Sequence, residues 1–183
     1  IFGLTWMSVF VPLVHLVPLA RDLGVDSLRA ATLVSALGIA AVAGRIAMGW
    51  VSDRIGRRPV LAVGLALQSA SFVGLAHATG LPALYAAALA FGFSYGTIST
   101  IFPAMVADFF GRANAGSLVG LLFGIAAPSA AVGPVAAGWI YDRHGGYELA
   151  WWLSAGINLA ALALLAFARP PGRAPIDRSA RAR

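Results

Sequence analysis

The feature that most constrains this chain is its division into six long apolar runs separated by short polar segments. The runs lie near residues 1–20, 29–52, 59–78, 81–105, 114–139 and 147–168. Each has about 20 residues or more, the length of helix that crosses the hydrocarbon core of a bilayer. Because a backbone in lipid must satisfy its hydrogen bonds internally, we expect these runs to be helices. The chain therefore predicts an all-α integral membrane bundle.

The composition supports a chain embedded in lipid. Hydrophobic residues make up 60% of the 183 residues and charged residues 11%, about half the charged fraction of an average soluble domain. The chain has no cysteine and three scattered histidines, so we expect no disulfide, metal site or other cofactor. The net charge of +6 lies at span ends and in a tail, which favours membrane lipids as partners over nucleic acid.

The arginines predict how the spans are oriented. Nine lie on the side where the second, fourth and sixth spans end: Arg54, Arg57, Arg58, Arg112, Arg169, Arg173, Arg178, Arg181 and Arg183. The opposite side has Arg21, Arg29 and Arg143. The positive-inside rule makes the first side cytoplasmic. We therefore predict a multi-pass cell-membrane protein in which residues 169–183 form a basic, disordered cytoplasmic tail. The use of arginine in place of lysine and the abundance of Ala and Gly favour a bacterial inner membrane.

A short motif occurs twice, at the ends of the second and fifth spans. The two copies are GWVSDRIG at residues 49–56 and GWIYDRHG at residues 138–145, which lie 89 residues apart. In the predicted orientation one copy lies inside and the other outside. Two three-helix units related by an inverted repeat would give this arrangement, although chance similarity between two span ends would also produce it. In this alignment Arg45 corresponds to Pro134, so the repeat does not extend to that charge.

Four stretches resemble the major facilitator superfamily. The loop motif GWVSDRIGRRP, residues 49–59, is similar to the one that joins the eighth and ninth helices of its twelve-helix transporters. Residues 10–25, 103–124 and 133–152 resemble the monocarboxylate transporter and oxalate/formate antiporter branch. The resemblance implies the C-terminal six-helix half of such a carrier. Because Ile1 stands inside an apolar run, we expect a fragment that lacks the N-terminal six-helix half.

Arg45 is the first candidate for a binding residue. It lies eight residues before Asp53, about 12 Å deeper in the membrane on a helix. A charge at that depth costs about 2.5–3.5 kcal/mol even on the lenient insertion scale. Arg45 is therefore expected either to snorkel or pair with an acid of the absent half, or to bind an anionic substrate in a central cavity. A guanidinium suits a carboxylate because it can donate two parallel hydrogen bonds, and the resemblance implies the same role.

The chain departs from the family pattern near this arginine. Animal monocarboxylate transporters have an aspartate one turn earlier that takes part in proton coupling, whereas this chain has Ala41. The oxalate exchanger has a second cation on its eleventh helix, whereas the fifth span of this chain has no Lys or Arg. A single visible cation favours a monocarboxylate over a dicarboxylate, and proton coupling stays open.

The span-end motif predicts a conformational gate. Its candidate residues are Gly49, Asp53, Arg54, Gly56, Arg57 and Arg58. The resemblance implies that the aspartate and the arginines hold helices of the two halves together in the outward-open state through charge and helix-dipole contacts. The alternative is a basic loop that only fixes the topology.

Three further residues are weaker candidates. Tyr95 and Phe91 share a face of the fourth span and are expected to line the cavity beside the substrate, or to serve in helix packing. His15 is a candidate proton relay because histidine titrates near neutral pH, or an interfacial hydrogen-bonding group.

An enzymatic function is not expected. Residues 92–96 read GFSYG and fit the serine nucleophile pattern, but that pattern requires a strand-to-helix turn and this one lies in an apolar span.

The predicted function is secondary transport of a small organic anion by alternating access, as symport or antiport. Two alternatives stay open: a self-sufficient half-transporter that dimerises, and a membrane sensor or scaffold that transports nothing.

Overall fold

The computed structural model describes residues 1–168, and these residues form six helices. Their bounds are α1 Phe2–Asp22, α2 Ser27–Ile55, α3 Arg57–Ala76, α4 Leu81–Phe110, α5 Arg112–His144 and α6 Glu148–Phe167. All six are long and apolar enough to cross a membrane. The prediction of an all-helical membrane bundle with six spans is therefore confirmed. The predicted tail, residues 169–183, lies outside the described residues.

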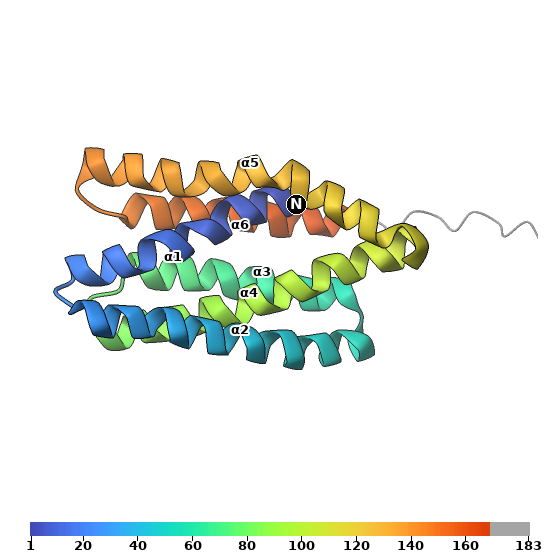
Figure 1. The fold of residues 1–183 in the computed structure, drawn as a ribbon, viewed down its shortest axis with the longest axis horizontal. Coiled ribbons are helices and arrows are strands. Elements are labelled where there is room, and N and C mark those ends of the chain that lie inside the picture. The colour runs from blue at the N-terminus through green and yellow to red at the C-terminus, as the bar shows by residue number, and fades with distance from the viewer. Residues whose placement is uncertain (169–183) are drawn as a thin grey trace, which may run out of the picture.

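The helices run along one long axis and alternate in direction (Figure 1). We call the end where α2, α4 and α6 finish the tail end, and the end where α1, α3 and α5 finish the far end. Figure 1 shows α1 beside α5 and α6, with α2, α3 and α4 grouped below them. The hydrophobic core lies among these helices, and α5 leaves most of its surface uncovered.

Several helices extend beyond the predicted spans. The structure continues α2 to Ile55, α4 to Phe110 and α5 to His144. Hydropathy detects only the part of a helix that lies in hydrocarbon, whereas the helix itself continues until a capping residue or a turn ends it. At the start of α2, the Asp26 carboxylate accepts hydrogen bonds from the backbone amides of Leu28 and Arg29, each at 3.1 Å.

Two single glycines connect helices at the tail end. Gly56 separates α2 from α3 and Gly111 separates α4 from α5. Their φ angles are +93° and +84°, a region that L side chains rarely adopt. Because one residue reverses the chain at each joint, the residues before and after it are held close together.

The helix contacts have the pattern of two equivalent three-helix units. Exchanging α1, α2 and α3 for α4, α5 and α6 turns every contacting pair of helices into another contacting pair. For example, α2 with α4 becomes α5 with α1, and α2 with α3 becomes α5 with α6. This pattern agrees with the predicted inverted repeat.

The closest helix crossings occur at equivalent positions of the two three-helix units. Gly44 of α2 lies directly against the Phe93 carbonyl of α4, and Gly133 of α5 lies directly against the Met7 carbonyl of α1. These glycines are 89 residues apart, the offset of the duplicated motif. At the α2–α4 crossing, Gly92 and Gly96 of α4 are equally close to the backbone of α2. Small residues therefore bring helix backbones into contact, as in other membrane bundles.

A second glycine strip does not pack within the described bundle. Gly116, Gly120 and Gly124 follow one another every fourth residue along α5, yet a Cβ atom built on any of them would meet nothing within 4 Å. Glycine spacing alone predicts that another helix packs closely against α5, but it does not identify that helix.

Candidate functional site

Arg45 lies within α2, ten residues before its last residue, Ile55. That position is about 15 Å from the tail end of the helix. The side chain is exposed in the described bundle, and no carboxylate of residues 1–168 lies within salt-bridge distance of it. The described helices therefore do not neutralise this charge.

Two residues of α4 orient the Arg45 side chain. The Arg45 Nε–H donates to the Ser99 hydroxyl at 3.4 Å, and this hydroxyl in turn donates to the Gly96 carbonyl at 3.0 Å. The guanidinium carbon lies 6.0 Å from the centre of the Tyr95 ring, at the limit of a cation–π contact. Ser99 thus engages one edge of the guanidinium and leaves the two terminal nitrogens without a partner among the described residues.

The structure separates the two aromatic candidates of α4. Tyr95 is half-buried and reaches Arg45, whereas Phe91 is 0% exposed and lies in the hydrophobic core against Phe72. The rings of Phe91 and Tyr95 are parallel, with an interplanar angle of 1° and centroids 6.2 Å apart. Phe91 does not reach the surface that carries Arg45, so its position gives no support to contact with a substrate. Phe91 packs on the core side of Tyr95.

Arg57 is the centre of an ionic cluster at the tail end. Its Nη1 lies 2.6 Å from a carboxylate oxygen of Asp53, and its Nε lies 3.3 Å from a carboxylate oxygen of Asp108. Arg57 also donates to the Ser52 hydroxyl, which donates to the Gly49 carbonyl. The Gly56 joint makes this arrangement possible because it brings the start of α3 back beside the end of α2. The cluster connects the tail ends of α2, α3 and α4.

Asp108 is a member of this cluster that the sequence reasoning did not identify. A signal for it exists, because residues 53–57 and 108–112 both read D-x-x-G-R, DRIGR and DFFGR. Each copy places its aspartate in the last turn of a helix and its glycine at a single-residue joint. The similarity between the two joints therefore points to Asp108 as a second acidic group at the tail end.

The remaining gate candidates have different surroundings. Arg58 donates to the carbonyls of Leu165 and Ala166 at 2.9 and 3.3 Å and so caps the last turn of α6. The Arg54 guanidinium lies 3.4 Å from the centre of the Trp50 ring. At Gly49 a Cβ atom would make an ordinary contact with Thr100 at 3.7 Å. Within the described bundle, Arg58 has a structural contact and Gly49 is not required for packing.

His15 lies near the far end, buried between three helices. Its Nε2 lies 3.0 Å from the Pro134 carbonyl of α5, and its Nδ1 lies 3.2 Å from the Tyr147 hydroxyl. A carbonyl only accepts, so Nε2 carries the proton, and in a neutral ring Nδ1 accepts from the phenol. Burial raises the pKa of Tyr147, and the nearby Asp22 carboxylate raises it further. The phenol therefore keeps its proton at neutral pH, and both His15 nitrogens have a hydrogen-bond partner.

This geometry gives a testable expectation for His15. Replacing it by Leu removes two buried hydrogen bonds and is expected to lower the free energy of unfolding by about 1–3 kcal/mol. Thermal unfolding of the full-length protein in detergent measures the loss. If His15 has only this structural role, the pH profile of the predicted transport will keep its shape in His15→Asn. A profile that loses its pH dependence would instead support the predicted proton relay.

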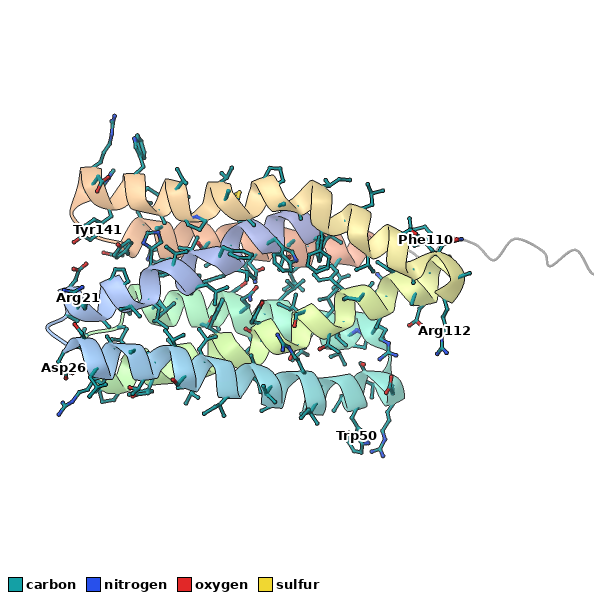
Figure 2. All side chains as sticks on the ribbon, in the orientation of Figure 1. Arg21, Asp26, Trp50, Phe110, Arg112 and Tyr141 are labelled. Carbon is teal, nitrogen blue, oxygen red and sulfur yellow. The ribbon has the colours of Figure 1, made fainter. Side chains whose placement is uncertain are left out.

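The two ends of the bundle carry different charges and aromatic residues. Figure 2 shows Trp50, Phe110 and Arg112 at the tail end, and Arg21, Asp26 and Tyr141 at the far end. Phe110 and Trp50 are exposed, as expected for aromatic residues at a membrane interface.

Comparison with known proteins agrees with this architecture. The profile of the Major Facilitator Superfamily matches residues 1–183. Monocarboxylate transporter 12 of Rattus norvegicus is 31% identical over 160 residues, covering 85% of this chain and 33% of that protein. Monocarboxylate transporter 7 of Homo sapiens is 33% identical over 176 residues, covering 93% and 34%. The uncharacterized MFS-type transporter YhjX of Escherichia coli (strain K12) is 30% identical over 118 residues, covering 60% and 29%. The chain thus spans about a third of the length of these relatives.

Proposed function

The chain belongs to the Major Facilitator Superfamily, and from that premise we propose that it is one six-helix half of a carrier that moves a small monocarboxylate across a membrane by alternating access. The family and its monocarboxylate transporter relatives identify a membrane transport protein rather than an enzyme. The remaining length of the relatives, about two thirds, leaves room for a second six-helix half. In this proposal the arginine-rich tail end is cytoplasmic and is called the inner end, and the far end is the outer end.

The observation that carries this proposal is the environment of Arg45. The residue is deep within a membrane-spanning helix, exposed on the described half and without a carboxylate partner there. Leaving a charge at such depth is costly unless water or a counter-ion compensates it. Ser99 holds the guanidinium by its Nε edge, so the two terminal nitrogens can donate together to one carboxylate.

A monocarboxylate fits this site better than a dicarboxylate. Arg45 is the arginine that the described spans place beside the aromatic ring of Tyr95, and one guanidinium neutralises one carboxylate. The ring of Tyr95 offers an apolar surface for the short carbon chain of such a substrate. The names of the two monocarboxylate transporters are in line with this substrate class.

The inner-end cluster supports the gating part of the proposal. The Asp53–Arg57–Asp108 cluster connects the inner ends of α2, α3 and α4 into one unit. In the outward-open state this unit contacts the inner ends of helices in the other half, and the contact breaks when the inner side opens.

Uptake by vesicles tests the proposed function. Full-length protein is reconstituted, and entry of labelled lactate, pyruvate and formate is compared with entry of labelled oxalate and of a neutral analogue such as lactamide. We expect saturable uptake of at least one monocarboxylate and none of lactamide. If oxalate is the substrate that enters fastest, the monocarboxylate assignment is wrong. If no organic anion enters, a non-transporting membrane scaffold becomes the better explanation.

Ser99 provides a prediction about how Arg45 is positioned. Ser99→Ala removes the acceptor of the Arg45 Nε–H, so we expect the KM for the substrate to rise by roughly threefold to tenfold, the size of one ordinary hydrogen bond. Uptake kinetics measure the change. Ser94→Ala is the matched control, since the buried Ser94 hydroxyl donates to the Phe91 carbonyl within α4 and does not contact Arg45. Equal KM values for Ser99→Ala and the parent protein would contradict the positioning role.

A further inference from the structure

We propose that the second copy of the duplicated motif is an outer gate latch, formed by Trp139, Asp142 and Arg143 at the outer end of α5. The proposal rests on the alternating-access function above. It gives the outer copy the converse role of the inner copy: the outer latch holds the outer side closed, whereas the inner cluster holds the inner side closed.

The two copies form the same local structure at opposite ends of the bundle. In the inner copy the Arg54 guanidinium lies 3.4 Å from the centre of the Trp50 ring, and in the outer copy Arg143 lies 4.4 Å from the centre of the Trp139 ring. The two tryptophans are 56% and 54% exposed. The repeat therefore preserves an exposed aromatic–arginine pair, and not only a sequence similarity.

The difference between the copies is in how the aspartate is neutralised. Asp53 is paired with Arg57 at 2.6 Å. Adding the repeat offset of 89 to Arg57 gives position 146, which is a glycine. Within residues 1–168, Asp142 has no ion pair, although it lies in the last turn of α5. A negative charge there is unfavourable because the carbonyl end of a helix is itself negative.

The surrounding residues hold the Asp142 turn firmly in place. The adjacent Tyr141 ring stacks on Tyr147 with centroids 4.4 Å apart and an interplanar angle of 27°. Tyr147 also contacts His15 of α1. Asp142 and Arg143 are exposed beyond this packed layer, so both charges lie at the surface beside a well-packed turn. The same last turn holds Arg143 and His144, and neither forms an ion pair with Asp142 within residues 1–168. A carboxylate that departs from the helix-end rule in this way is typical of a functional position.

The expected occupant is the outer end of the second six-helix half. In the inner cluster Arg57 already pairs with Asp53, and the cluster contacts the other half as a preassembled unit. The outer latch is incomplete, so its partner surface should present a basic group to Asp142 and an acidic or carbonyl group to Arg143. These contacts form only when the two halves meet at the outer side, so they stabilise the inward-open state.

Thiol labelling of the full-length protein tests this role. Gly38→Cys, in a background without other cysteines, places a thiol seven residues from Arg45 toward the outer end, where a Cβ atom meets nothing within 4 Å. A membrane-impermeant maleimide added from outside reacts faster when the outer side is open. We expect Asp142→Asn and Arg143→Gln each to raise the labelling rate by roughly twofold to fivefold, the range of an exposed ion pair.

Two controls make the result specific. Glu148→Gln removes another exposed carboxylate at the same end and is expected to leave the rate unchanged. Asp53→Asn weakens the inner cluster and is expected to lower the rate. If Asp142→Asn and Arg143→Gln leave the labelling rate unchanged or lower it, the outer latch is refuted. If one of the two variants does not insert into the membrane, the other alone decides the question. Labelling requires no substrate, so a shifted rate together with absent monocarboxylate uptake would refute the substrate class and retain the latch.

Discussion

Arg45→Ala is expected to abolish saturable uptake, and Arg45→Lys is expected to reduce kcat/KM by roughly 100-fold or more. Alanine removes the charge together with its hydrogen bonds, whereas lysine keeps the charge but loses the paired donors and the Nε–H that Ser99 accepts. Two charged hydrogen bonds account for an effect of that size. Initial rates over a range of monocarboxylate concentrations in reconstituted vesicles measure it.

Arg112→Lys is the control for the Arg45 variants. Arg112 is an exposed arginine at the start of α5, so its replacement by lysine is expected to preserve uptake within about twofold. Uptake with an unchanged KM in both Arg45 variants would show that Arg45 is not the substrate site.

Gly44→Ala is expected to destabilise the protein more than any substitution of an exposed charged residue at the bundle ends. The new Cβ would overlap the Phe93 carbonyl oxygen and come within 2.9 Å of its carbon. Both atoms belong to a helix backbone, so the added methyl group must push α2 and α4 apart. The cost of overpacking is about 1–3 kcal/mol. The separation also moves Arg45, the next residue, away from Ser99, so we expect a lower melting temperature together with a higher KM.

Gly38→Ala is the matched control on the same helix. Its Cβ meets nothing within 4 Å, and alanine has the higher helix propensity, so stability should be unchanged or slightly greater. Gly133→Ala tests the equivalent crossing and is expected to destabilise the protein as Gly44→Ala does. If Gly44→Ala and Gly38→Ala melted at the same temperature, the close α2–α4 crossing would be refuted.

Much of the fold could be predicted from the sequence because lipid imposes strong local rules. Apolar runs of sufficient length must form helices, so the six spans follow from hydropathy. The positions of the helix ends were predicted less accurately, since α4 and α5 extend beyond the predicted runs to Phe110 and His144. Hydropathy reports transfer into hydrocarbon, whereas helices continue into the polar segments.

Only part of the candidate site could be predicted from the sequence pattern. A charge in an apolar run identified Arg45 as a candidate without a structure, because the cost of that charge depends only on the residue and on the lipid around it. Phe91 and Tyr95 share a helix face and could not be separated by spacing. The structure buries Phe91 against Phe72 and leaves Tyr95 beside Arg45. Asp108 became evident as a partner only when the Gly56 joint brought Arg57 toward the end of α4.

The sequence by itself determined the membrane class, the six spans, the family resemblance and the duplicated motif, because each depends on residues that are close in the chain or on their transfer into lipid. The tertiary structure decided which helices cross, which glycines lie against a neighbouring backbone at those crossings, and which partners Arg45, Arg57 and Arg58 have. Those features depend on atoms that are distant in sequence, such as Gly44 and Phe93 or Arg58 and Leu165. Local pattern cannot specify such pairs, since the same helix face can meet lipid, water or another helix.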